Sequence, residues 1–246
     1  MYHKTFKTAS TSMIIVILLS LFVFSIESSI AQDLNDTLQK LKSRNPGIRI
    51  DAAVALGEAK DPRALRPLIT VLKKDRDGDV RGAAEDALVN IGTPAVNSLI
   101  PLLEDQQWRV RRRAVRTIGR IKDSSAIGAL IQASGTDTDC CVRRFAAQWL
   151  GEIKDDRAAQ YLHNAARTKK IEIVKGAYRF FMRRGESGTE SILIEALHMS
   201  FDRNMINDFV NSGNHRLKEA ALKYAEGRYA PKISTDWKGP RWGQDI

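Results

Sequence analysis

The densest run of chemically active side chains in this sequence is rich in arginine. It extends from Trp108 to Arg120, and a helix over this stretch would turn Val110, Ala114, Val115 and Ile118 towards the core. The opposite face would then carry a stripe of five arginines: Arg109, Arg112, Arg113, Arg116 and Arg120. Guanidinium groups bind carboxylates in a bidentate manner. We therefore expect this stripe, extended by Arg144, to bind an acidic partner, and a solvated basic face is the alternative.

A second basic feature recurs through the chain at one position of a repeated pattern. It comprises Arg49, Arg81, Arg111, Arg143 and Lys175. This ladder could bind a ligand. A structural role is the favoured interpretation, in which each cation pairs with an aspartate in a neighbouring turn, such as Asp77, Asp79, Asp105 or Asp139.

The remaining candidates indicate no familiar chemistry. Cys140 and Cys141 are adjacent, so a bridge between them would be strained, and we interpret them as small residues at a helix start. Pairing between chains is the alternative. The four histidines are scattered, and no catalytic motif stands out. The sequence therefore predicts no catalytic residue, no metal and no cofactor.

Two tryptophans lie in the C-terminal segment 230–246. Trp237 and Trp242 stand among Gly and Pro residues, beyond the last expected helix. Either they fold back over the last repeat, or they are offered to a partner.

The helices that position these residues are encoded by a sequence pattern that repeats about every 32 residues. The pattern Val-Arg-x-x-Ala-Ala-x-x-Leu-Gly begins at Ile48, Val80, Val110 and Val142, and Val174 begins a degraded copy. Aspartate, threonine or proline breaks the chain between each such helix and the next apolar run. Each repeat is therefore a pair of short helices, and stacked pairs bury a common core. We expect an all-α fold, an α-solenoid of five to six repeats over residues 32–229, whose inner helices line a groove.

The start of the chain has a different character. Two lysines precede an apolar run from Met13 to Ile26, and small residues follow up to Ala31. This order predicts a secretory signal peptide over residues 1–31. We expect an exported protein, periplasmic or extracellular, and anchored in a membrane if the segment is not cleaved. The net charge of +10 then favours an acidic protein over nucleic acid.

The repeat motif, with Asp-Pro-x-Ala-x-x-x-Leu-Ile after it, resembles the HEAT-like repeats of the phycobilisome-lyase type. The resemblance covers residues 33 to about 228 and implies an armadillo-like helical array. Phycobilin lyases attach bilins to cysteines inside photosynthetic cells, which conflicts with export. Deoxyhypusine hydroxylase shares the scaffold and holds iron through His-Glu pairs, which this sequence lacks at His163, His198 and His215.

From these observations we predict a non-enzymatic binding scaffold that holds an acidic or extended protein on its inner-helix face. Membrane contact is expected only through an uncleaved first segment or the basic surface. The alternative is an enzyme, or the accessory subunit of one, built on the same repeats. Binding of anionic lipid or glycan is a third possibility.

Overall fold

The computed structural model describes residues 32–199, 201–234 and 236–244. The predicted signal peptide, residues 1–31, lies outside the described residues. Every regular element within the described ranges is helical, and none of these helices is long and apolar enough to cross a membrane. The all-α prediction is therefore confirmed. The chain divides into two compact units, Met1–Ile91 and Gly92–Ile246, which are described separately.

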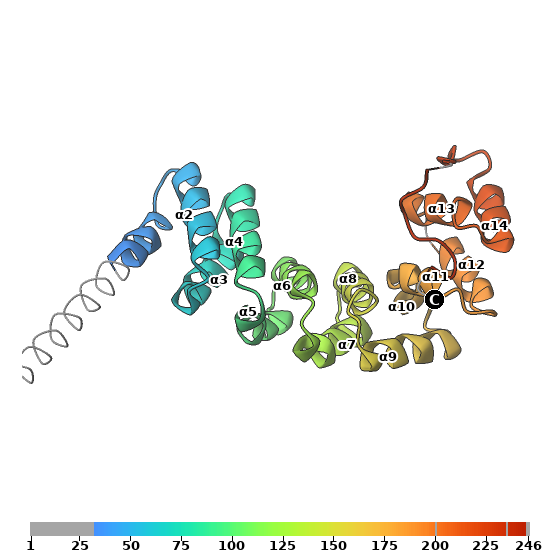
Figure 1. Ribbon diagram of the computed structural model, residues 1–246, viewed down its shortest axis with the longest axis horizontal. Helices are drawn as coiled ribbons and strands as arrows, with labels where there is room; N and C mark the ends of the chain where they lie inside the picture. The colour runs from blue at the N-terminus through green and yellow to red at the C-terminus, as the bar shows by residue number, and fades with distance from the viewer. Residues whose placement is uncertain (1–31, 200, 235, 245–246) are drawn as a thin grey trace, which may run out of the picture. The chain divides into compact units, whose positions relative to one another are not determined.

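The first unit is built from helix pairs. Its helices are residues 32–40, α2 (Pro46–Ala59), the 3₁₀ turn η1 (Pro62–Ala64), α3 (Leu65–Lys74) and α4 (Gly78–Ile91). The inner helices α2 and α4 lie side by side, and α3 packs against α4 (Figure 1). Gly57 makes this approach possible, because a Cβ atom there would lie 2.6 Å from the Cα of Ala87.

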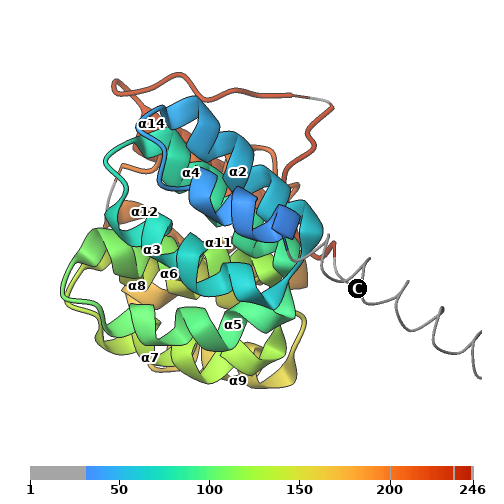
Figure 2. The same ribbon diagram turned by 90° about the vertical axis from the view of Figure 1, so that its left-hand side faces the viewer.

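The second unit continues the same alternation. Its elements are α5 (Thr93–Leu99), η2 (Ile100–Glu104), α6 (Trp108–Ile121), η3 (Ser124–Ala126), α7 (Ile127–Thr136), α8 (Cys140–Leu150), α9 (Asp156–Arg167), α10 (Ile171–Gly176), α11 (Tyr178–Arg184), α12 (Glu190–His198), α13 (Arg203–Val210) and α14 (His215–Ala225). Within this unit α5, α7 and α9 form one layer, and α6, α8 and α11 lie in the other (Figures 1 and 2).

The helix boundaries follow from local capping chemistry. Asp123 and Asp155 each accept a hydrogen bond from the backbone N–H two residues later, at 2.8 and 2.9 Å. Asp61 does the same in the first unit. These carboxylates satisfy backbone donors that a helix start leaves without an intrahelical partner. The aspartates that the sequence marks as breaks are therefore the residues that start the next helix.

The fifth repeat departs from the others. Its inner helix is interrupted at Ala177, which separates α10 from α11. The pattern position held by a small alanine in the other four repeats is occupied here by Tyr178. Arg179 follows it, where the third repeat has Val115 and the fourth has Ala147, both buried. A small residue at the first of these positions allows close helix packing, so the larger side chains change the local structure.

Candidate functional site

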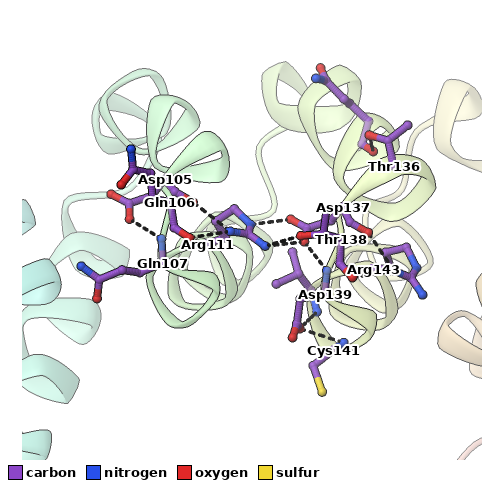
Figure 3. Close-up of polar contacts among 12 residues, drawn as sticks. Asp105, Gln106, Gln107, Arg111, Thr136, Asp137, Thr138, Asp139, Cys141 and Arg143 are labelled. Atoms are coloured by element: carbon purple, nitrogen blue, oxygen red, sulfur yellow. Dashed lines mark hydrogen bonds and ion pairs between the residues drawn. The ribbon is translucent and has the colours of Figure 1, made fainter.

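The basic ladder ties successive turns together, as Figure 3 shows for Arg111. The Nε and Nη2 atoms of Arg111 donate to the two carboxylate oxygens of Asp137, both at 2.8 Å. Its Nη1 atom donates to the backbone carbonyl of Asp105 at 2.9 Å. One guanidinium group thus joins the turn before its own helix to the turn before the next inner helix. We call this arrangement the clasp.

Arg49 repeats the clasp in the first unit. It pairs with Asp75 through Nε and Nη2 at 2.8 and 2.9 Å, and its Nη1 atom donates to the carbonyl of Ser43. The acids of the clasp are Asp75 and Asp137, which lie two residues before the Asp77 and Asp139 predicted from the sequence. Asp77 and Asp139 instead cap the helices that follow them, because each accepts a hydrogen bond from a backbone N–H of the first turn.

The clasp is incomplete at two positions of the ladder, Arg81 and Arg143, which donate only to backbone carbonyls among the residues that the structure describes. Arg143 donates through Nη1 to the carbonyl oxygens of Asp137 and Thr138, at 2.7 and 3.3 Å. Arg49 and Arg111 each have an aspartate 26 residues later in the chain. The residue 26 positions after Arg143 is Lys169, which cannot accept a hydrogen bond from a guanidinium group. In the part of the chain that the structure describes, Arg143 makes no hydrogen bond to a carboxylate, although its charge helps to lower the pKa of Asp137.

The electrostatics of the clasp favour an ionised acid. Burial opposes ionisation of Asp137, but the hydrogen bonds from Arg111 and from the N–H of Asp139 outweigh it. Together they hold the pKa of Asp137 below its usual value. Arg111 and Asp137 are 12% and 4% exposed, so their pairing contributes to stability, and both also line a hollow of about 360 Å³.

The predicted arginine stripe lies on α6. Val110, Ala114, Val115 and Ile118 are buried on its other face. Arg109, Arg116 and Arg120 are exposed, whereas Arg112 and Arg113 are half-buried. The guanidinium groups of Arg109 and Arg112 stack over the ring of Trp108, at 5.4 and 5.2 Å from its centroid. Trp108 therefore supports two cations and keeps part of its own apolar ring in contact with solvent.

Arg144 lies in a different environment, at the edge of a hollow of about 250 Å³. The hollow is formed by α8, α10, α11 and the start of α13. Its lining contains three cations, Arg144, Lys175 and Arg179, and we call it the basic hollow. Arg144 stacks over Phe145 at 5.7 Å and lies 3.9 Å from a carboxylate oxygen of Asp202.

Tyr178 and Arg179, which line the basic hollow, form a polar cluster with the buried Asp208. The hydroxyl group of Tyr178 donates to Asp208 Oδ2 at 2.6 Å, and Arg179 Nε donates to the same oxygen at 2.9 Å. Burial raises the pKa of Asp208, despite these two hydrogen bonds. Burial, together with the charge of Asp208, also raises the pKa of Tyr178. The hydroxyl group therefore remains a donor at neutral pH.

The C-terminal tail folds back onto the second unit. The backbone N–H of Trp242 donates to the carbonyl of Ser212, and that of Gly243 donates to the carbonyl of Met182, both at 2.9 Å. Trp237 and Trp242 are half-buried. Trp237 packs against Gly239, where a Cβ atom would lie 2.5 Å from the indole ring.

The cysteines and histidines form no cluster suited to a metal. Within the described ranges, no group of three or more His, Cys, Asp or Glu residues could hold an ion. Cys140 is exposed and Cys141 half-buried, both as free thiols at the start of α8.

The fold and these contacts define a class of protein, the helical-repeat arrays. The pattern of the HEAT repeats family matches residues 23–89, 65–143, 96–183 and 127–207, so the chain belongs to this family. It is a HEAT-repeat protein of the phycobilisome-lyase type, as its resemblance to that type predicts.

Three named relatives share the repeats. Phycocyanobilin lyase subunit beta of Nostoc sp. strain PCC 7120 is 34% identical over 115 residues, which are 47% of this chain and 53% of the relative. A phycobilisome maturation protein of Synechococcus elongatus is 31% identical over 117 residues, 45% of this chain and 56% of the relative. Phycocyanin alpha phycocyanobilin lyase CpcF of Synechocystis sp. strain PCC 6803 is 30% identical over 122 residues, 49% of this chain and 56% of the relative. The chain thus spans about half the length of these relatives.

One solved structure is among those similar to this chain. It is the complex of CpcE and CpcF of phycocyanin lyase from Nostoc sp. PCC7120, with 21% sequence identity and a TM-score of 0.42. The match covers 66% of this chain and 98% of the matched chain.

These relatives correct three predictions made from the sequence. The main prediction of an exported, non-enzymatic binding scaffold is wrong, because the relatives are named as phycocyanobilin lyases and a phycobilisome maturation protein. For the same reason the prediction that the chain is not an enzyme is wrong. The predicted periplasmic or extracellular location is also contradicted, because the relatives are named as phycobilisome maturation and phycocyanobilin lyase proteins.

The sequence reasoning missed the buried cluster of Tyr178, Arg179 and Asp208. One signal was available: Asp208 interrupts an apolar run in which Met205, Ile206, Phe209 and Val210 are all buried. Acidic residues are almost never fully buried without a partner, so this position indicated a buried contact.

Proposed function

We propose that this chain is a subunit of a bilin-lyase type of enzyme, which binds an open-chain tetrapyrrole and delivers it to an acceptor protein. The observation that carries the proposal is the similarity of 30–34% to proteins named as phycocyanobilin lyases. This proposal takes up the alternative interpretation of the sequence, an enzyme or the accessory subunit of one built on the repeats. It replaces the interpretation as a non-enzymatic binding scaffold.

The surface of α6 suits such a ligand chemically. Phycocyanobilin combines a flexible, conjugated and largely apolar body with two propionate groups. Trp108 offers a ring for contact with the body, and Arg109 and Arg112 stack over that ring as carboxylate-binding groups. We assign ligand binding to the stripe of Arg109, Arg112, Arg113, Arg116 and Arg120, together with Arg144 on the neighbouring helix α8.

We also propose that the chain works with a protein partner. One relative is named as the beta subunit of a lyase, and this chain spans 53% of that relative's length. The net charge of +10 favours an acidic partner surface over a basic one.

The direct test is a binding titration of the purified chain with phycocyanobilin, followed by the absorbance of the tetrapyrrole. We expect a saturable spectral change in the micromolar range, since binding to a protein restricts the conformations of the chromophore. The variant R109E/R112E should weaken binding at least tenfold, because it replaces two attractive charges with repulsive ones.

The matched control is K218E/K223E, which makes the same charge change on exposed residues of α14. This control should bind like the unmodified chain. If the unmodified chain produces no spectral change, the proposed function is wrong. If both double variants weaken binding equally, the stripe on α6 has no specific role.

A further inference from the structure

The basic hollow exists because one repeat differs from the other four. At the two adjacent positions where the third and fourth repeats bury Ala114–Val115 and Ala146–Ala147, the fifth repeat has Tyr178 and Arg179. Gly176 lets this repeat approach α8 closely, because a Cβ atom there would lie 2.7 Å from the carbonyl oxygen of Arg144. This close approach helps to bring Lys175 and Arg179 into one hollow with Arg144.

Hydrogen bonds to Tyr178 and to the buried Asp208 fix the orientation of Arg179. Its Nε atom donates to Asp208 at 2.9 Å and to the hydroxyl oxygen of Tyr178 at 3.1 Å. Asp208 is only 3% exposed, whereas Arg179 is 42% exposed. A buried acid thus holds the inner edge of a guanidinium group that lines the hollow.

The charges of the hollow are unbalanced. Three cations line it, against Asp202 in the lining and Asp208 behind Arg179. One oxygen of Asp202 already accepts hydrogen bonds from the N–H groups of Asn204 and Met205 at the start of α13. The other lies 3.9 Å from Arg144, longer than a hydrogen bond. An anion entering the hollow would therefore meet donors that this acid does not saturate.

We propose that Arg144, Lys175 and Arg179 form a carboxylate-binding site. Asp208 and Tyr178 are positioning residues, which act by holding Arg179. The inference rests on the proposed function, and under it the bound group is one propionate of the tetrapyrrole. A hollow of about 250 Å³ lies below the usual size of a pocket for a whole drug-sized ligand, but it accommodates a propionate arm.

The test compares phycocyanobilin with its dimethyl ester, in which both propionates are uncharged. We expect the free acid to bind at least tenfold more tightly than the ester. The substitution R179Q should reduce the affinity for the acid about tenfold, the effect of losing one charge-assisted hydrogen bond, and leave the ester unchanged. K223Q, on the exposed surface of α14, is the matched control and should change neither affinity.

The positioning role has its own readout. In D208N the neutral side chain still accepts a hydrogen bond from Tyr178 but no longer pairs with the charge of Arg179. We expect D208N to lower the acid-to-ester affinity ratio severalfold, with an unchanged helical circular dichroism signal. A purely structural role would lower both affinities together and leave their ratio constant, which would overturn the assignment.

The outcomes separate the two proposals. If the unmodified chain binds acid and ester equally, the carboxylate site is wrong and the lyase-type function stands. If it binds neither, the proposed function fails and the carboxylate site fails with it. If acid is preferred but R179Q and K223Q behave alike, the carboxylate is bound elsewhere and this site is wrong.

Discussion

The clasp between Arg111 and Asp137 should be among the most stabilising polar contacts of the second unit. The substitution R111M keeps an unbranched side chain but removes both hydrogen bonds to Asp137 and the one to the carbonyl of Asp105. It also leaves Asp137, 4% exposed, without its counter-charge. Breaking a buried ion pair from one side costs about 3–5 kcal/mol, and partial solvent access to Arg111 places this case near 3 kcal/mol.

Arg143 provides the matched control, because it occupies the same repeat position but, within the described residues, hydrogen-bonds only to backbone carbonyls and reaches Asp137 only through its charge. R143M removes hydrogen bonds to two backbone carbonyls and should cost about 1 kcal/mol. The two variants should therefore differ by about 2 kcal/mol.

The assay is urea unfolding of the full chain, followed by far-ultraviolet circular dichroism, with D137N as the background for a double-mutant cycle. R111M should cost at least 1 kcal/mol less in the D137N background, since the acid that it leaves unpaired is no longer charged. Equal losses for R111M and R143M, or an R111M effect that D137N does not alter, would refute this account of the clasp.

Three further predictions concern stability. The pKa of Asp137 is lower in the folded state than in the unfolded state. The stability that its pair with Arg111 contributes is therefore fully present above the unfolded-state pKa of about 4, and it is lost as the pH falls through the folded-state pKa. The difference between unmodified chain and R111M, measured by urea unfolding from pH 7 down to pH 3, should shrink at the acid end, and a constant difference would contradict the lowered pKa. G119A should cost about 2 kcal/mol, because its Cβ atom would lie 2.0 Å from the ring of Trp149, and an unchanged urea midpoint would show that the ring moves aside freely. A chain ending at Tyr229 should lose at least about 2 kcal/mol, because it removes the two backbone hydrogen bonds of Trp242 and Gly243 and three exposed ones of Lys232 and Ser234. Thermal unfolding at the same midpoint as the full chain would show that the tail adds nothing.

The repeats could be predicted from the sequence because their pattern records burial. Leu56, Leu88, Ile118, Leu150 and Met182, the pivots of the five copies, are all 0–1% exposed. Helical periodicity and capping aspartates are local signals, so no long-range information is needed to find them.

The basic hollow could not be predicted in the same way. Tyr178 and Asp208 are 30 residues apart, on helices that belong to the irregular end of the array. The repeat pattern marks Tyr178 as a departure but contains no information about which residue it contacts. The function was missed for a related reason: the pattern specifies how neighbouring helices pack, and this packing is compatible with many ligands.

The change of the clasp at Lys169 has a consequence for how the second unit opens. Repeat arrays derive much of their cooperativity from contacts between neighbours, and a junction that lacks one such contact opens at a lower free energy. The carboxylate clasp joins α6 and α8 through Asp137, but it is missing where α8 meets α10. Amide hydrogens of α10 and α11 should therefore exchange with solvent before those of α6. The basic hollow spans this junction, with Arg144 on one side and Arg179 on the other, and Arg183 joins α11 to Glu152 just after the end of α8. Local opening would then separate the two cations, which gives a buried or bulky ligand group a route in and out without unfolding the rest of the unit.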